Sequence, residues 1–252
     1  MEKLSVYIVA KNEETHIKEV VISALKVAEE VIVVDSGSTD KTKNIASKAG
    51  AKVIFHKWKN ISAQKQFAEK QCVNDWVMNL DADEVLPPAL QTEINQFMRN
   101  PTADACKLKI GDMFPGYTKP RKWGRTYNIV RMYNQKSAYM PDDFNNDRAV
   151  FKVTNPKIHQ FKTVVHHYSY QGLGKLITKL NTFTDAIVET MLKKDKKYCP
   201  LRIYIEFPTQ FLKYYFLKRY IFNGYYGFLV SVIYAFFRFI RLTKYKEAIR
   251  KK

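Results

Sequence analysis

Cysteine is scarce in this sequence, which has only Cys72, Cys106 and Cys199 among its 252 residues. Three widely spaced cysteines form neither a disulfide framework nor the close pairs of a zinc site, which favours a reducing compartment. A recognisable targeting segment is lacking as well. The apolar run Leu4–Ala10 ends at Lys11 without a small-residue cleavage site, so it predicts a strand rather than a signal peptide. We therefore expect a cytoplasmic protein.

Long apolar runs are also few. The uncharged run Ile221–Phe237 has 17 residues diluted by asparagine, glycine and tyrosine, whereas a membrane span needs about 20 mostly apolar residues. Four basic residues follow it at near-helical spacing: Arg238, Arg241, Lys244 and Lys246. Basic, aromatic-rich helices lie in the interface of membranes that contain anionic lipid. We expect such a peripheral helix here; the alternative is that its aromatic residues pack into a protein core.

Acidic residues are lacking in the second part of the chain. Residues 1–100 have 13 Lys and Arg against 14 Asp and Glu, whereas residues 101–252 have 29 against 10. The formal net charge of +18 therefore belongs to the last three-fifths of the sequence. A basic surface of this kind suits an anionic membrane, an anionic substrate or a nucleic acid.

The first hundred residues alternate between β-rich runs and helical patterns. We expect strands at Leu4–Ala10, Val31–Val34, Lys52–Phe55 and Trp76–Leu80. We expect helices within 14–30, from a cap at Ser38 or Thr39 to Gly50, and over Ser62–Cys72. This alternation predicts an α/β fold, with a mainly parallel sheet flanked by helices. From about residue 101 the rhythm breaks, and helical periodicity returns only after Gly174.

Polar residues gather where three of these strands end. Asn12 and Glu13 follow the first strand, residues 35–40 (Asp-Ser-Gly-Ser-Thr-Asp) the second, and residues 81–84 (Asp-Ala-Asp-Glu) the fourth. Each cluster alone also fits a turn or a helix cap. Because ligands bind parallel sheets at the carboxyl ends of their strands, the three clusters together favour a ligand site.

The pair Asp81 and Asp83 has a specific chemical use. Residues two apart in an extended or turning segment point the same way, so both carboxylates can address one site. Hard oxygen ligands suit Mg²⁺ or Mn²⁺, which complete their coordination with water and phosphate oxygens. Such a cation neutralises the charge that develops on a diphosphate leaving group.

In order and spacing, these motifs resemble those of the family 2 glycosyltransferases. The matching segments are residues 5–13 (Ser-Val-Tyr-Ile-Val-Ala-Lys-Asn-Glu), 34–40, Gln64-Lys65-Gln66 and 81–84. Within that family the chain most resembles the lipopolysaccharide inner-core β-1,4-glucosyltransferases, more loosely beyond residue 110. The resemblance implies a GT-A (Rossmann-like) fold and a metal-dependent, inverting hexosyltransferase. It would move a hexose, glucose by expectation, from a UDP-sugar to a lipid-linked saccharide at the inner face of a bacterial membrane.

The resemblance also assigns parts and roles by position. Residues 1–110 would bind the nucleotide sugar, 111–198 the acceptor, and 199–252 would form a helical, membrane-associating extension. The expected donor-site residues are Asn12 and Glu13 in the nucleotide pocket, Asp35 on the uracil, Ser36, Gly37 and Ser38 beneath base and ribose, Lys65 on the diphosphate, and Asp81 on the ribose or the metal. Asp83 would be the metal ligand.

Inverting transfer also needs a general base for the acceptor hydroxyl. Related sequences commonly have a Val-His-Glu-like segment shortly before the His-Tyr-Ser-Tyr stretch at 167–170, where this chain has Asn145-Asn146-Asp147-Arg148. Asp147 is the first candidate for the base, followed by Asp143 and Asp142. The alternative is that Asp147 and Arg148 form a surface ion pair.

Further residues have two interpretations each. The adjacent His166 and His167 point to opposite faces of a strand and cannot chelate one ion together; His167 is the candidate that completes the metal site, or a core or surface histidine. The basic residues Arg121, Lys122, Arg125 and Arg131 would bind phosphate groups or, more plainly, form a solvated basic face.

Two other functions fit parts of the sequence. A nucleotidyltransferase also pairs carboxylates with a metal, but it usually has a glycine-rich basic loop after the first strand, where this chain has Lys11-Asn12-Glu13-Glu14. A basic module that binds membranes or nucleic acid would leave the acidic clusters of the first hundred residues without a purpose. We expect no nucleic-acid partner.

Overall fold

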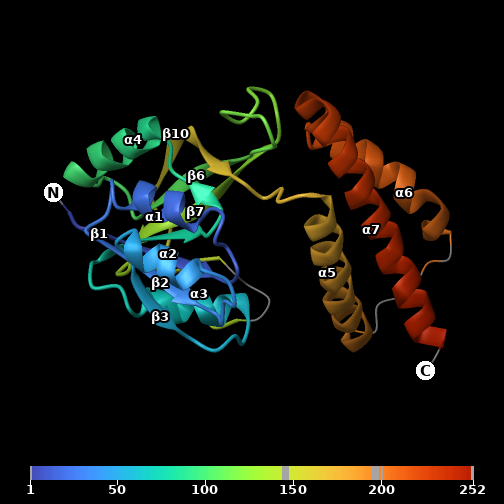
Figure 1. Cartoon of the computed structure of the whole chain (residues 1–252), viewed down its shortest axis with the longest axis horizontal. Coiled ribbons are helices and arrows are strands. Elements are labelled where there is room, and N and C mark those ends of the chain that lie inside the picture. Colours follow the sequence, from blue (N-terminus) through green and yellow to red (C-terminus); the bar gives the residue numbers. More distant parts are fainter. Residues whose placement is uncertain (1, 144–147, 195–198, 200, 251–252) are drawn as a thin grey trace. The chain divides into compact units, whose positions relative to one another are not determined.

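The computed structural model describes residues 2–143, 148–194, 199 and 201–250, which form two compact units (Figure 1). Unit 1 comprises Met1–Gly111 and Thr126–Tyr168, and unit 2 comprises Asp112–Arg125 and Ser169–Lys252. The segment 112–125 therefore leaves the first unit and folds with residues from the last third of the chain. The functional division expected at residues 110 and 198 stays a prediction.

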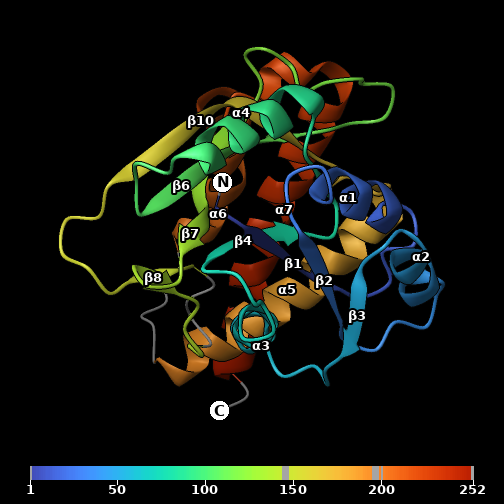
Figure 2. The same cartoon turned by 90° about the vertical axis from the view of Figure 1, so that its left-hand side faces the viewer.

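Unit 1 is built on one eight-stranded sheet with the order β3-β2-β1-β4-β7-β6-β10-β5 (Figure 2). Its strands are β1 (Leu4–Ala10), β2 (Glu30–Asp35), β3 (Lys52–Phe55), β4 (Trp76–Asp81), β5 (Glu84–Val85), β6 (Ala105–Asp112), β7 (Thr126–Asn134) and β10 (Ile158–His167). The strands β3, β2, β1 and β4 are parallel, and β7 pairs with β4 in the antiparallel sense. A separate two-stranded sheet joins β8 (Ala138–Tyr139) to β9 (Val150–Phe151).

Helices cover both faces of this sheet. They are α1 (Ile17–Ala24), α2 (Thr42–Lys48), α3 (Ile61–Glu69) and α4 (Pro88–Arg99). Because side chains alternate along a strand, Val6 and Ile8 of β1 join the core beneath α1, α2 and α4, whereas Tyr7 joins a second core with Ala68 of α3. The helix-flanked mixed sheet, with its first four strands parallel, confirms the expected α/β fold of GT-A type.

Local details differ from the sequence-based expectation. Neither Ser38 nor Thr39 caps α2, since the N-cap position is Lys41 and the backbone N–H of Thr42 donates to the Asp40 carboxylate at 3.0 Å. All three helices are also shorter than expected, because their last residues enter turns that lead into the next strand.

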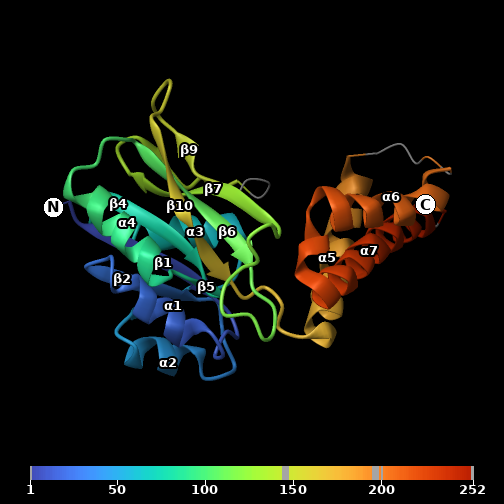
Figure 3. The same cartoon turned by 90° about the horizontal axis from the view of Figure 1, so that it is seen from above.

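Unit 2 contains three long helices and two short helical turns. These are α5 (Leu173–Lys193), α6 (Arg202–Leu212), the π-helical turn η1 (Lys213–Leu217), the 3₁₀ turn η2 (Tyr220–Asn223) and α7 (Gly224–Arg250). Helix α7 lies against both α5 and α6 (Figure 3). The buried core of this unit is formed by Phe114, Leu176, Tyr220, Val230, Ile233 and Phe237. Gly227 permits the close approach of η2 to α7, because a Cβ atom there would lie 1.8 Å from the Tyr220 carbonyl oxygen.

Three of the four basic residues that follow the apolar run, Arg238, Arg241 and Lys244, contact carboxylates within unit 2. Arg238 and Arg241 lie 3.4 and 3.8 Å from the carboxylate of Glu206 on α6, and that glutamate is buried. Lys244 binds Asp185 on α5 at 2.6 Å. These charges are directed into the helical unit because a buried carboxylate requires cationic partners.

Within the described residues, one helical segment, Tyr220–Arg250, is long and apolar enough to cross a membrane by length and composition alone. From the sequence we expect the apolar run within it to be a marginal span at best. A buried core helix passes the same test, and 39% of the apolar window is buried inside the protein.

Candidate active site

The polar clusters meet at the carboxyl edge of the parallel strands. Strand β1 lies between β2 and β4, and their register pairs Ala10 with Asp35 on one side and Val9 with Asp81 on the other (Figure 2). Two carboxylates that are 46 residues apart in the sequence therefore flank the end of one strand. This is the place where a parallel sheet binds its ligands.

The loops after β1 and β2 are joined by hydrogen bonds. The backbone N–H of Asn12 donates to Ser38 Oγ at 3.0 Å, and Asn12 Oδ1 accepts from the backbone N–H of Thr39 at 2.8 Å. Asn12 has a positive φ of 57°, a conformation that asparagine tolerates better than most residues. The backbone N–H of Glu13 donates to Thr42 Oγ1 at 2.8 Å. These contacts hold the two loops in one fixed arrangement.

Asp35 shapes the second of these loops. It is fully buried, and its carboxylate accepts the backbone N–H groups of Gly37 at 2.9 Å and Ser38 at 3.0 Å. The turn depends on Gly37, whose φ of 94° strains other residues. Next to it, the buried Ser36 Oγ has no hydrogen-bond partner among the described residues. A buried hydroxyl without a partner costs free energy, so it marks a point where a ligand can bind.

Helix α3 brings a lysine to the same edge. The Asn60 side chain caps this helix by accepting the backbone N–H of Ala63 at 2.8 Å. Gln64 fixes the preceding loop by donating to the carbonyl of Lys57 at 2.9 Å. The side chain of Lys65 is 4% exposed, and its Nζ lies 3.6 Å from Asp81 Oδ1. The structure thus brings together Lys65 and Asp81, as the sequence motifs suggested.

Asp81 is the centre of an ion-pair network. Arg131 of β7 lies 2.5 Å from Asp81 and 3.0 Å from the buried Glu84, and it donates to Asn79 Oδ1 at 2.6 Å. Burial alone would raise the pKa of Asp81, but the cations Arg131 and Lys65 outweigh it and hold that pKa well below its usual range. Burial raises the pKa of Glu84. Arg131 therefore does not belong to a solvated basic face, because it lies in the interior with two carboxylates.

Asp83 points to a different partner. Its Oδ1 lies 3.4 Å from His167 Nε2, and the two side chains are 14% and 17% exposed. Strand β5 brings them together, because Glu84 and Val85 pair with His167 and His166. The backbone of Asp83 also accepts the N–H of Tyr168 at 2.9 Å.

The pair Asp83 and His167 fits one kind of metal site. Mg²⁺ and Mn²⁺ are often held by one or two protein side chains together with substrate phosphates and water. Among the described residues, no group of three or more His, Cys, Asp or Glu side chains could hold a metal ion. The two side chains therefore suit a cation that shares its coordination with a bound diphosphate.

The candidates for the general base stay a prediction. Asp147, the first of them, lies outside the described residues, and Asp143 is exposed. Asp142 is exposed and forms an ion pair with Lys59, 3.2 Å from its Nζ.

Sequence reasoning missed the roles of Asn79, Glu84 and Arg131 in this site. A signal for Arg131 was present, because it is a charged residue within the apolar stretch Ile129–Met132. Such a residue on a buried strand needs a partner of opposite charge. Its partners lie about fifty residues earlier in the sequence, so no local pattern identifies them.

Comparison with known proteins now identifies the family. A family model described as glycosyl transferase family 2 matches residues 5–154. An uncharacterized glycosyltransferase of Rickettsia typhi is 38% identical over 256 residues, which cover 98% of this chain and 88% of that relative. The chain belongs to glycosyl transferase family 2. The lipopolysaccharide core biosynthesis glycosyltransferase LpsC of Rhizobium meliloti is 39% identical over 93 residues, covering 35% of this chain and 34% of LpsC.

The chain also has similarity to solved structures. TarS of S. aureus is 18% identical with a TM-score of 0.49, and the match covers 74% of this chain and 40% of that one. Glucosyl-3-phosphoglycerate synthase of Mycobacterium tuberculosis, solved with Mn²⁺, UDP and phosphoglyceric acid, is 23% identical with a TM-score of 0.35. That match covers 46% of this chain and 44% of the synthase.

Proposed function

We propose that this glycosyltransferase transfers a hexose, glucose by our expectation, from a UDP-sugar to a lipid-linked saccharide with inversion at the anomeric carbon. Membership of family 2 supports sugar transfer. The partial similarity to LpsC supports a saccharide of the lipopolysaccharide core as the acceptor. One structural observation carries the donor assignment: Asp35 and Asp81, with the loops that follow them, flank the carboxyl end of β1.

The nucleotide would bind along this edge. The loop of residues 35–38 presents Ser36 Oγ without a partner among the described residues, which suits a hydrogen bond to the base or ribose. Lys65 lies on the opposite side of β1, at Asp81, where its ammonium group would bind the diphosphate. Asp81 stays ionised beside Arg131, so it can accept a hydrogen bond from a ribose hydroxyl.

Asp83 and His167 would hold a divalent cation at the diphosphate. When bound, such a cation supplies charge neutralisation for the leaving diphosphate. The chain's own residues position the reaction: Arg131 fixes Asp81, and the pairing of β5 with β10 fixes Asp83 against His167. An aspartate of the 142–147 segment would take the proton from the acceptor hydroxyl, with Asp147 as our first candidate and Asp143 as the second.

Association with the cytoplasmic face of a membrane is part of the proposal. Apolar side chains of α6, η1 and the start of α7 are unusually exposed, including Tyr204 (79%), Leu217 (79%) and Tyr225 (72%). Exposed basic residues lie at Lys213, Lys218 and Arg219 in the same region. Apolar patches bordered by cations mark surfaces that bind anionic lipid. We therefore expect this surface to contact lipid in place of Arg238, Arg241 and Lys244, whose charges face carboxylates of unit 2. Lys246 stays a candidate for lipid contact.

A binding experiment tests the donor assignment. Calorimetric titrations with UDP-glucose, UDP-galactose, GDP-mannose and dTTP would be run with and without Mn²⁺. We expect a UDP-hexose to bind most tightly, with Mn²⁺ increasing its affinity. Equal binding of UDP-glucose and GDP-mannose would contradict the uracil site. Preferential binding of dTTP would instead favour a nucleotidyltransferase.

A further inference from the structure

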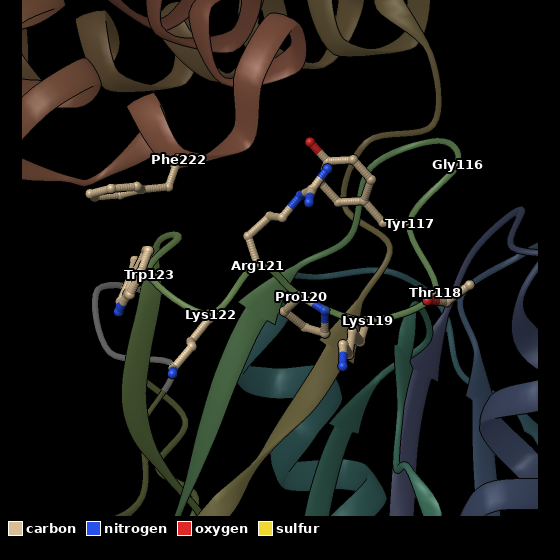
Figure 4. Close-up of a pocket in the computed structure, with 9 residues that line it drawn as sticks. All are labelled: Gly116, Tyr117, Thr118, Lys119, Pro120, Arg121, Lys122, Trp123 and Phe222. Atoms are coloured by element: carbon tan, nitrogen blue, oxygen red, sulfur yellow. The ribbon is translucent and has the colours of Figure 1, made fainter.

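A pocket lies within unit 2, and none of the residues assigned to the donor lines it. It has a volume of about 460 Å³ and is formed by the segment Gly116–Trp123 together with Phe222 of η2 (Figure 4). This size lies within the range of pockets that bind small molecules. No step of the proposed donor chemistry uses these residues.

The charge of this pocket has one sign. Lys119, Arg121 and Lys122 line it, and none of the residues that line it is acidic. The sequence has no Asp or Glu between Met113 and Pro141. Across the described part of the chain, no ion pair is recorded for any of the three cations. A pocket lined by three cations and no carboxylate has a positive potential, so it favours the binding of an anion.

Aromatic rings line the same pocket. Figure 4 shows the Arg121 guanidinium stacked on the ring of Tyr117, at 4.4 Å from its centroid. Trp123 is 58% exposed, and its ring lies 6.0 Å from that of Phe222 in an edge-to-face arrangement. Exposed aromatic faces of this size bind apolar surfaces, and the C–H face of a pyranose ring is one. A free phosphate ion has no group that would use them.

The pocket is anchored at its base. Tyr117 Oη donates to the Asn223 carbonyl at 2.9 Å, and Gly124 closes a turn by donating its backbone N–H to the Arg121 carbonyl at 3.0 Å. A side chain at Gly124 would clash, because its Cβ would lie 2.8 Å from Asn223 Oδ1. The segment is therefore held against η2 by contacts within one unit, and it is preorganised in the way that binding sites require.

We propose that this pocket binds an anionic saccharide, a sugar ring that carries a phosphate or carboxylate group. Basic side chains that line the pocket, Arg121 and Lys122 among them, bind the anionic group, and Trp123 with Phe222 binds the face of the sugar ring. Identification of this saccharide with part of the acceptor rests on the transferase function proposed above. The binding itself does not.

The test is direct binding of three soluble probes, glucose 6-phosphate, glucose and inorganic phosphate, measured by calorimetry without any nucleotide. For the wild type we expect glucose 6-phosphate to bind more tightly than either of the other probes. Each lost charge-assisted hydrogen bond corresponds to roughly a tenfold weaker affinity. Arg121→Gln/Lys122→Gln should therefore weaken glucose 6-phosphate by about tenfold or more. The charge-matched control Lys43→Gln/Lys48→Gln, on exposed positions of α2, should bind like the wild type.

The aromatic contribution needs its own variant. Trp123→Ala should weaken glucose 6-phosphate several-fold and leave inorganic phosphate unchanged, while Trp123→Phe should restore part of the loss. Fluorescence locates the ligand: in a Trp58→Phe background the remaining tryptophans are Trp123 and the buried Trp76. Glucose 6-phosphate should protect Trp123 from acrylamide quenching. Circular dichroism of each variant confirms that it is folded.

Several results would overturn the inference. One is that the Arg121/Lys122 variant and the Lys43/Lys48 control bind glucose 6-phosphate with equal affinity. Another is that inorganic phosphate binds the wild type as tightly as glucose 6-phosphate does. A third is loss of binding to phosphatidylglycerol vesicles in the Arg121/Lys122 variant with unchanged affinity for glucose 6-phosphate, because the pocket would then bind lipid headgroups. Titration of the same preparations with UDP-glucose separates the two proposals. A protein that binds UDP-glucose but not glucose 6-phosphate would refute only the proposed pocket ligand. A protein that binds glucose 6-phosphate but not UDP-glucose would refute only the donor assignment.

Discussion

Arg131 and Asp81 form an ion pair with 2.5 Å between Nη2 and Oδ2, although they are 50 residues apart in the chain. The same guanidinium binds Glu84, so one buried cation faces two carboxylates. Asp81 thus has Arg131 as its closest partner, whereas Asp83 lies beside His167. The two aspartates of residues 81–84 consequently have different protein partners.

Removal of this cation should destabilise unit 1. Arg131→Gln would leave Asp81 and the fully buried Glu84 without their main partner. Loss of one member of a buried pair costs about 3–5 kcal/mol, and we expect the lower end because Asp81 is 37% exposed. Urea unfolding gives the free energy of unfolding, with Arg99→Gln at an exposed position as the control. An equal free energy for both variants would show that the pair is not a stabilising element.

The metal assignment gives a second prediction. Asp83→Ala and His167→Ala should each reduce the enhancement of UDP-sugar affinity by Mn²⁺, and Asp83→Ala should abolish transfer while the fold survives. Asp75→Asn, at an exposed acid that pairs with Lys136, is the control for lost negative charge. The measurement is calorimetric titration of UDP with and without Mn²⁺. Full transfer in the presence of a chelator, or in Asp83→Ala, would refute a metal-dependent mechanism.

The nucleotide site gives a third. Asp35→Ala removes the acceptor of two backbone N–H groups and a group proposed to bind uracil, so UDP should bind about 1–3 kcal/mol more weakly. Asp35→Asn keeps one oxygen acceptor and should lose less. If the folded Asp35→Ala variant binds UDP like the wild type, the proposed uracil contact is wrong.

Much of unit 1 could be predicted from sequence because its signals are local. The first four strands are short apolar runs, and the clusters that contain Asn12, Asp35 and Asp81 lie at or just after the ends of three of them. Order along the chain and the rule for parallel sheets were sufficient to bring those clusters to one edge.

The remainder depends on contacts between distant residues. Tyr117 binds the backbone of Asn223, 106 residues later, and Lys244 binds Asp185 across 59 residues. No spacing in the sequence shows that 112–125 folds with the C-terminal helices. Likewise, Arg238 and Arg241 have a spacing typical of a basic surface stripe. The buried Glu206 that turns them inward is visible only in three dimensions.

A pH dependence follows from Glu69 on α3. Burial raises the pKa of Glu69 even though Tyr133 donates a hydrogen bond to its carboxylate. The folded state therefore binds the Glu69 proton more tightly than the unfolded chain does. The stability that this proton contributes is complete below a pH of about 4.3 and is lost as the pH rises through the raised pKa of Glu69. We expect the wild type to lose stability relative to Glu69→Gln over this window. Urea unfolding at several pH values gives the free energy of unfolding of the wild type minus that of Glu69→Gln. We expect this difference to fall as the pH rises, and a constant or rising difference would contradict the prediction.

Membrane binding gives a prediction that separates two surfaces. Lys213→Gln/Lys218→Gln/Arg219→Gln should weaken binding to vesicles of phosphatidylcholine and phosphatidylglycerol, since each cation near such a surface contributes about 1 kcal/mol. Arg238→Gln/Arg241→Gln removes cations that bind Glu206 and should alter stability more than vesicle affinity. Co-sedimentation at increasing salt measures the affinity. A larger loss of vesicle affinity in the Arg238/Arg241 variant would show that α7, and not the segment Lys213–Arg219, contacts the lipid.

We propose that this chain is an inverting transferase that uses a UDP-hexose. Its most direct test is incubation with UDP-glucose carrying ¹³C at the anomeric carbon, Mn²⁺ and a bacterial lipopolysaccharide core acceptor, followed by NMR of the products. We expect UDP release together with a new β-linked anomeric signal, and we expect both to be absent in Asp83→Ala. An α-linked product would contradict inversion, and release of pyrophosphate in place of UDP would contradict sugar transfer.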